Sequence, residues 1–133
     1  PTKFSKKIIN SSSIAYELLK EVWSDKLEWI EEFVLLPVNT INEPLGYIKL
    51  FTGGLDKTIV DSRVVFQIAL VASASGIIVS HNHPSGSAKP SKGDIEITKT
   101  LSQLGKILGI PLLDHIIITP TGYYSFKDEG LIY

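Results

Sequence analysis

Residues 76–94 read GIIVSHNHPSGSAKPSKGD, and this stretch predicts a strand, a polar loop and the start of a helix. The apolar run at its beginning, residues 76–79, is typical of a buried strand. Beyond the stretch, apolar residues recur at spacings of four, three and four, which indicates an amphipathic helix with one face formed by Ile97, Leu101, Leu104 and Leu108. A junction of this kind presents polar side chains at the edge of a sheet, where ligands commonly bind.

Two histidines in this loop are candidate metal ligands. His81 and His83 are two residues apart at the end of an extended segment, so their rings point to the same side. Neutral imidazole is the commonest protein ligand for zinc, with Zn–N distances of about 2.0–2.1 Å. A third, anionic ligand would leave a fourth position for water, as in catalytic zinc sites, and Asp94 is the best placed donor. The prolines and glycine between them form a stiff turning connection that can bring Asp94 back beside the histidines.

The same residues also fit the start of a helix without any metal. Ser91 is a typical N-cap, and Asp94 in the first turn is favoured by the helix dipole. Aspartate is, however, shorter than the Glu or Gln of a standard capping box. On this interpretation His81 and His83 are surface loop residues. A His-x-His pair alone has many accidental matches, but the added serine, aspartate, buried strand and prolines favour a metal site.

The spacing of these residues resembles a known motif. His81-x-His83, followed after seven residues by Ser91 and after two more by Asp94, resembles the JAMM (MPN-type) metalloprotease motif. The fuller string His-Asn-His-Pro-Ser-Gly resembles the RadC branch of that superfamily, as do the segments 113–117 and 123–130. The resemblance covers roughly residues 30–133. Residues 1–10 show no pattern and are expected to be a loose lead-in, and the resemblance implies that one RadC-like JAMM domain follows, residues 11–133.

The pattern of apolar residues predicts helices interleaved with strands. Serines at 11–13 can cap a helix whose apolar face ends at Trp23, and Asp61 can cap another. Strands are expected at residues 33–38, with Pro37 indicating an edge strand or bulge, and at 47–51, 76–79, 115–119 and 123–126. The long helix after the motif is expected to stop near Gly109. This order indicates a single α/β or α+β domain, and the resemblance implies a central mixed sheet flanked by helices, as in JAMM and cytidine-deaminase-like folds.

Length and composition exclude several classes of protein. A chain of 133 residues with 44% hydrophobic residues fits one soluble globular domain. The net charge of −1 gives no general attraction to nucleic acid or to anionic membranes. The absence of cysteine excludes disulfides, thiol nucleophiles and thiolate metal sites. No membrane span or signal peptide is visible, so we expect a cytoplasmic protein, and a start at Pro1 leaves flanking domains open.

Two adjacent glutamates precede the first predicted strand. JAMM enzymes carry a glutamate at such a strand start, where it acts as general acid/base, and the Glu-x-Phe pattern assigns that role to Glu31 by resemblance. Strand alternation allows only one of Glu31 and Glu32 to face the site, and both otherwise fit solvated charges. By the same resemblance Ser91 donates a hydrogen bond to the developing oxyanion. The pair Asp114-His115 is interpreted as structural and left out of the ligand set. The single arginine, Arg63, is available to pair with a carboxylate.

The favoured function is a zinc-dependent metallohydrolase that cleaves peptide or isopeptide bonds in a peptide or protein substrate. One Zn²⁺ per chain is expected on His81, His83 and Asp94, and Fe²⁺ is the alternative because two histidines and a carboxylate also hold non-haem iron. A non-catalytic binding module that keeps the metal loop for structure is a second possibility. A DNA-repair-associated accessory protein is a third, although the charge disfavours direct nucleic-acid binding. The oligomeric state is left open.

Overall fold

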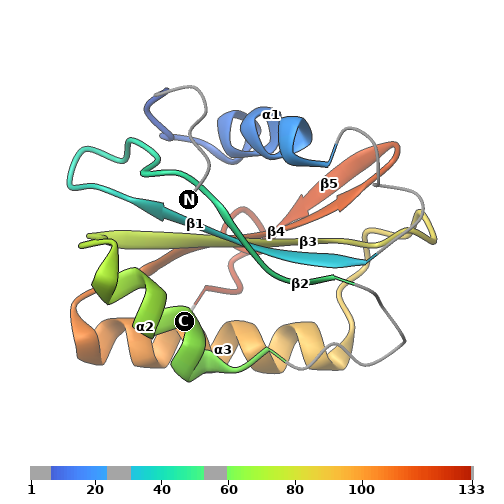
Figure 1. Cartoon of the computed structure of the whole chain (residues 1–133). Coiled ribbons are helices and arrows are strands. Elements are labelled where there is room, and N and C mark those ends of the chain that lie inside the picture. The colour runs from blue at the N-terminus through green and yellow to red at the C-terminus, as the bar shows by residue number, and fades with distance from the viewer. Residues whose placement is uncertain (1–6, 24–30, 53–59, 133) are drawn as a thin grey trace.

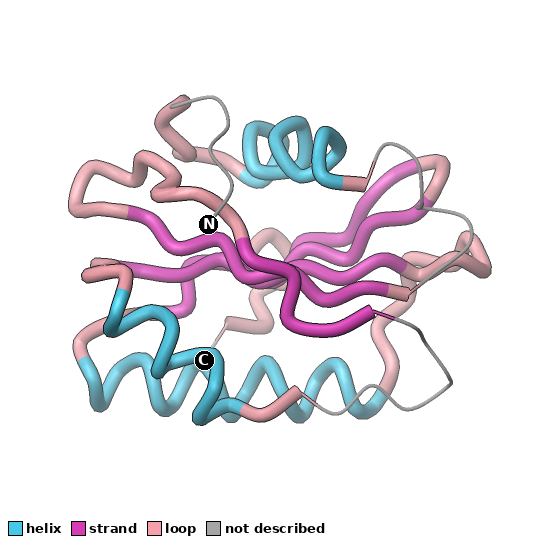
Figure 2. Tube along the Cα trace, viewed as in Figure 1, coloured by secondary structure: helices cyan, strands magenta, loops and turns pink. Residues whose placement is uncertain are grey.

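The computed structural model describes residues 7–23, 31–52 and 60–132. A five-stranded sheet in the order β2-β1-β3-β4-β5 lies between helical layers, with α1 on one face and α2 and α3 on the other (Figures 1 and 2). The pair β3–β4 is parallel and the other neighbours are antiparallel, so the sheet is mixed, which confirms the predicted fold class. The elements are α1 (Ser12–Val22), β1 (Glu32–Val38), β2 (Ile48–Thr52), α2 (Ser62–Val71), β3 (Gly76–Asn82), α3 (Lys92–Leu108), β4 (Leu112–Thr119) and β5 (Gly122–Ser125).

Strands β1 and β3 form the middle of the sheet and are buried along their whole length. Alternate residues of each strand point to opposite faces, so each strand contributes to two apolar clusters. Val34 and Ile78 pack in the cluster under α1, whereas Leu35 and Val79 pack in the cluster that includes residues of α2 and α3. Because both faces are covered, β3 reads as a continuous apolar run.

The prediction that Pro37 marks an edge strand or a bulge is wrong, because β1 is an interior strand and the irregularity in its pairing with β2 lies at Phe33/Val34. Strand β1 lies between β2 and β3, and Pro37 is paired with Ile77 of β3. The last β1–β2 pair is Leu35↔Ile48, so Pro37 lies beyond the end of β2. Its carbonyl accepts a hydrogen bond of 2.8 Å from the N–H of Leu45, on the side away from β3. The nitrogen of Pro37, which has no hydrogen to donate, faces that same side. Because β2 has already ended there, the pairing of β1 with β2 loses no hydrogen bond.

The helices begin and end where local signals predict. Ser11 caps α1 by accepting from the N–H of Ile14, and Asp61 caps α2 by accepting from the N–H of Arg63 at 2.9 Å. The guanidinium of Arg63 also pairs with Asp61 at 3.1 Å, which confirms that it has a carboxylate partner. Helix α3 ends at Gly109, whose φ of 71° is the left-handed conformation that favours glycine.

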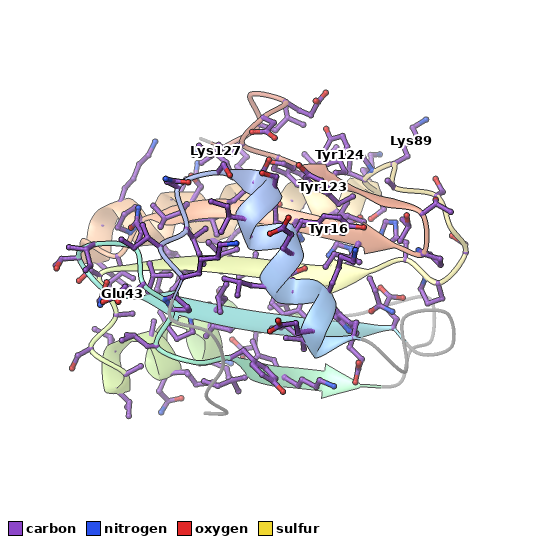
Figure 3. All side chains as sticks on the ribbon, turned by 90° about the horizontal axis from the view of Figure 1, so that it is seen from above. Tyr16, Glu43, Lys89, Tyr123, Tyr124 and Lys127 are labelled. Carbon is purple, nitrogen blue, oxygen red and sulfur yellow. The ribbon has the colours of Figure 1, made fainter. Side chains whose placement is uncertain are left out.

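Aromatic contacts attach α1 to the sheet edge. Tyr16 of α1 stacks on Tyr123 of β5 with ring centroids 4.4 Å apart, and Figure 3 shows the two rings together. Part of the expected lead-in is packed as well, because Ile9 is buried and its N–H donates to the carbonyl of Asn42; residues 1–6 lie outside the described residues. In the described ranges no helix has the length and apolar character needed to cross a bilayer.

Candidate metal centre

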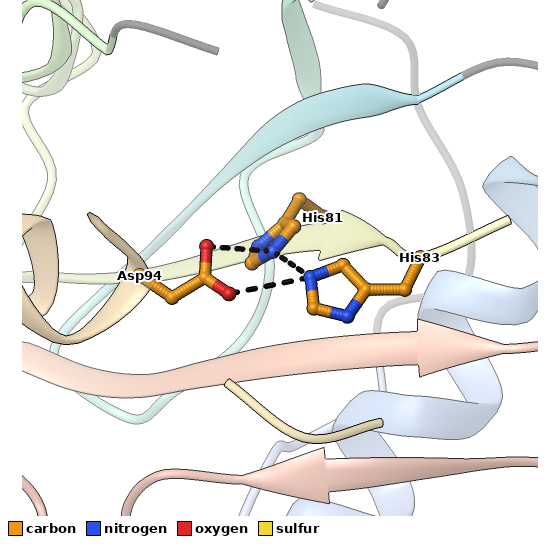
Figure 4. Close-up of side chains that lie close together, drawn as sticks. All are labelled: His81, His83 and Asp94. Atoms are coloured by element: carbon orange, nitrogen blue, oxygen red, sulfur yellow. Dashed lines mark hydrogen bonds and ion pairs between the residues drawn. The ribbon is translucent and has the colours of Figure 1, made fainter. Parts of the chain in front are cut away.

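Strand β3 delivers both histidines to one side of the sheet. His81 shares the face of Ile77 and Val79, towards α2 and α3, and is paired with Phe33 of β1. The chain continues beside β4 for one more residue, since the N–H of His83 donates to the carbonyl of Ile118 at 2.8 Å. The two rings therefore converge as the spacing predicts, with their Nε2 atoms 2.9 Å apart (Figure 4).

The crossover from β3 to β4 brings Asp94 to the same place. Because β3 and β4 are parallel, α3 runs back along the sheet and begins at the end of β3 where the histidines lie. The Asp94 carboxylate lies 3.1 Å from Nε2 of His81 and 3.2 Å from Nε2 of His83. The same carboxylate completes a capping box, accepting from the N–H of Ser91 at 2.8 Å while Ser91 Oγ accepts from the N–H of Asp94 at 3.0 Å. The helix-start and metal-site interpretations are thus compatible, because the cap fixes the carboxylate that faces the histidines.

The three side chains have the geometry of a metal site. One ligand atom from each of His81, His83 and Asp94 lies within 4.8 Å of the others. Atoms bound to zinc at about 2.0–2.1 Å in tetrahedral geometry lie about 3.3 Å apart, close to the observed separations. The ring of His83 is held for this role, because its Nδ1 donates to the carbonyl of Ser87 at 2.8 Å and leaves the Nε2 lone pair facing the other ligands. This donor set fits one divalent metal ion.

Charge in the site is concentrated on Asp94. Burial alone would raise the pKa of Asp94, but the adjacent rings of His81 and His83 outweigh it and hold the pKa far below its usual value. The hydrogen bond to Asp94 in turn raises the pKa of His83, against the opposing effect of burial. Asp94 is therefore ionised at neutral pH. A metal ion must displace the proton that this carboxylate favours on His83.

A third histidine, which the sequence analysis set aside as structural, contacts the site. His115 on β4 is fully buried, and its Nε2 lies 2.8 Å from Nδ1 of His81. His115 is not one of the three potential metal ligands, but its ring contacts His81, which is one of them. Burial lowers the pKa of His115 well below its usual value, so the ring is neutral. Asp114 fixes the backbone here by accepting from the N–H of His115 at 2.7 Å.

Sequence reasoning missed Thr98 altogether. Its hydroxyl on α3 lies 2.6 Å from Nδ1 of His115 and donates to the backbone carbonyl of Asp94 at 2.6 Å. Thr98 is fully buried, and these two hydrogen bonds satisfy its hydroxyl, as is usual for a buried polar group. One signal could have found it, since Thr98 is four residues after Asp94 and adjoins the apolar face marked by Ile97.

The two adjacent glutamates lie on opposite faces of the sheet. Glu31 lines the cavity that contains His81, His83 and Asp94, and its charge adds to the raised pKa of His83. Glu32 is fully buried on the α1 side and pairs with Lys49, 3.3 Å from its Oε1. The pleat of β1 separates the two carboxylates in this way.

Ser91 also lines this cavity. Its oxygen accepts the capping bond from Asp94, and accepting a bond leaves the hydroxyl proton available to donate into the cavity. The apolar part of the wall is formed by Phe33, Val60 and Ile97. The cavity therefore combines three potential metal ligands, a further carboxylate, a hydroxyl and an apolar surface.

Comparison with known proteins agrees with this geometry. A family model described as the RadC-like JAB domain matches residues 9–131. The chain belongs to the RadC-like JAB family. A relative named UPF0758 protein from Flavobacterium johnsoniae is 43% identical over 125 residues, which cover 94% of this chain and 54% of that protein. A UPF0758 protein from Thermotoga maritima is 49% identical over 86 residues, or 65% of this chain and 39% of that protein.

The RadC-like domain spans about half the length of the curated relatives it matches. The match to the family model confirms the RadC-like resemblance that the motif indicated. The names of the relatives state no reaction, substrate or metal.

Proposed function

We propose that this RadC-like domain is a zinc-dependent metallohydrolase that cleaves amide bonds in peptide or protein substrates. The observation that carries the proposal is the convergence of three potential metal ligands, His81, His83 and Asp94, in one cavity that is also lined by Glu31. A structural zinc site is normally closed by four protein ligands, whereas a catalytic site has three and an open position. Three ligands beside a separate carboxylate therefore favour catalysis over a purely structural site.

Zinc, when bound, lowers the pKa of a coordinated water towards 7 and polarises a carbonyl group. Glu31, which lines the cavity, accepts a proton from the attacking water in this proposal and delivers it to the leaving nitrogen. Ser91 donates its hydroxyl proton to the carbonyl oxygen as negative charge develops there. Phe33, Val60 and Ile97 line the cavity with apolar surface, which excludes water and favours an apolar substrate side chain.

Zinc is the proposed metal because two imidazoles and one carboxylate with an open position match known hydrolytic zinc sites. The same ligand set also suits iron(II) in oxygen-activating enzymes. A carboxylate positioned for proton transfer is needed for hydrolysis and supports the choice of zinc.

The test is a screen of the zinc-loaded protein against internally quenched peptide libraries and isopeptide-linked peptides, read by fluorescence and mass spectrometry. We expect cleavage that requires zinc, stops on chelation and is lost in His83→Ala together with the metal. Stoichiometric zinc binding with no cleavage of any library would contradict the hydrolase and favour the non-catalytic binding module. Cleavage that persists at full rate in metal-free protein would contradict the metal mechanism.

A further inference from the structure

A buried chain of hydrogen bonds joins one potential metal ligand to the backbone of another. Nδ1 of His81 lies 2.8 Å from Nε2 of His115, and Nδ1 of His115 lies 2.6 Å from the hydroxyl of Thr98. That hydroxyl lies 2.6 Å from the carbonyl oxygen of Asp94. The exposed fractions of His81, His115 and Thr98 are 3%, 0% and 0%, so water does not compete along the chain. The chain spans three elements, β3, β4 and α3.

The far end of this chain fixes its direction. A carbonyl oxygen can only accept, so Thr98 donates its single hydroxyl proton to Asp94. The Thr98 oxygen must then accept from Nδ1–H of His115. A neutral imidazole carries one N–H, so Nε2 of His115 accepts from Nδ1–H of His81. The remaining nitrogen of His81, Nε2, has a free lone pair that faces His83 and Asp94.

We propose that Thr98 and His115 are positioning residues that hold His81 in the tautomer able to bind the metal. The inference rests on the metal centre of the proposed function and does not require that the domain hydrolyses anything. Ligand histidines usually donate their second ring N–H to a fixed acceptor, and that partner orients the ring and sets its tautomer. His83 uses a backbone carbonyl, that of Ser87, directly. His81 reaches the carbonyl of Asp94 only through two side chains.

The surroundings of His115 keep its ring in this orientation. The ring stacks on Phe126, with centroids 4.6 Å apart and planes 9° apart, and meets the edge of Phe33 at 6.2 Å. Its backbone N–H donates to Asp114 and its carbonyl accepts from the N–H of Phe126 at 3.0 Å. The ring therefore cannot turn away without disrupting buried packing.

Removing the Thr98 hydroxyl should act on the metal through His81. In Thr98→Val the shape of the side chain is retained, but Nδ1–H of His115 loses its acceptor. The proton can move to Nε2 of His115, which then donates to Nδ1 of His81. The proton of His81 is thereby displaced to Nε2, the atom that must bind the metal. Both options, a buried unpaired N–H or the wrong tautomer, oppose metal binding.

The experiment measures the zinc dissociation constant by competition with a chromophoric chelator, with no substrate present. We expect Thr98→Val to bind zinc about 10–100-fold more weakly than the parent, the usual effect of removing such a partner. Thr98→Ser keeps the hydroxyl and should restore the affinity to within about threefold of the parent. The matched control is Ser80→Ala, which removes another fully buried hydroxyl, one that donates to the carbonyl of Ile116 at 2.7 Å. Ser80 adjoins His81 but faces the other side of the sheet, so its loss should lower stability without changing zinc affinity.

Equal zinc affinity in the parent and Thr98→Val would overturn the inference. Equal weakening in Thr98→Val, Thr98→Ser and Ser80→Ala would also overturn it, because general loss of stability would then explain the effect. If Thr98→Val does not fold, Thr98→Ala removes the same hydroxyl with a smaller side chain and carries the same expectation. A parent protein that binds no zinc would instead refute the metal centre of the proposed function, so the two failures are distinguishable.

Discussion

Replacing Glu31 with glutamine tests whether this carboxylate transfers the proton during hydrolysis. Glutamine has nearly the same shape, so Glu31→Gln should keep the cavity intact while removing the group that can exchange a proton. Glu31 is not one of the three potential metal ligands. Among the interactions that raise the pKa of His83, the charge of Glu31 has the smallest effect. Zinc content should therefore stay at the level of the parent.

General acid/base catalysis contributes about 10²–10⁴-fold to a rate, so turnover of Glu31→Gln should fall by about that factor. At about 1.36 kcal/mol for each tenfold, the loss corresponds to about 2.7–5.4 kcal/mol of transition-state stabilisation. The assay is the initial rate on a cleaved library peptide at saturating zinc, together with elemental analysis of each variant.

The structure supplies a matched control in the next residue. Glu32 lies on the opposite face of β1, buried against Lys49 at 3.3 Å, and cannot reach the cavity. The turnover of folded Glu32→Gln should remain within about threefold of the parent. Glu96→Gln, an exposed change on α3, provides a second control if Glu32→Gln does not fold. A parental rate in Glu31→Gln would refute the assignment, and a large loss only in Glu32→Gln would mean that the other carboxylate acts.

Three further predictions follow from the packing and charges. Because Asp94 raises the pKa of His83, the competing proton is bound at a higher pH than on a free histidine; zinc affinity should therefore begin to fall at a higher pH than a free histidine would require, and an affinity that does not change as the pH is lowered from about 8 to about 5.5 would contradict this. Chelation should lower the melting temperature but leave the circular dichroism at 25 °C unchanged, since apolar clusters on both faces of the sheet do not need the metal; loss of secondary structure in chelator would make the site structural. Gly105→Ala should lower the free energy of unfolding by about 1–3 kcal/mol, because its Cβ would lie 2.5 Å from the carbonyl oxygen of Ile110; in Gly93→Ala the nearest atom is 3.8 Å away, so denaturant unfolding of that control should show no loss.

The sequence alone determined the features that depend on short spacing. The two-residue step between His81 and His83 puts both rings on one side of any extended segment, wherever that segment lies. The three-residue step from Ser91 to Asp94 is a local signal for a helix start, and the structure has a capping box there. The buried run before the histidines, the helix after them and its end at Gly109 are also local patterns, and the structure has each of them.

Only the tertiary structure decided which distant residues meet. Alternation along β1 requires Glu31 and Glu32 to face opposite ways, but the pattern does not say which face carries the histidines. That depends on the register Phe33↔His81 between strands far apart in sequence. The interior position of β1, despite Pro37, likewise depends on where β2 ends.

The contact of His115 and Thr98 with His81 depends on the parallel pairing of β3 with β4 and on α3 packing across both. His115 has no local signature, and the spacing of Thr98 from Asp94 indicates only that the two share a helix face, because a hydrogen bond between side chains of different elements leaves no periodic pattern in the sequence. Local propensity and spacing determine elements and motifs, whereas long-range register determines which side chains surround the metal site.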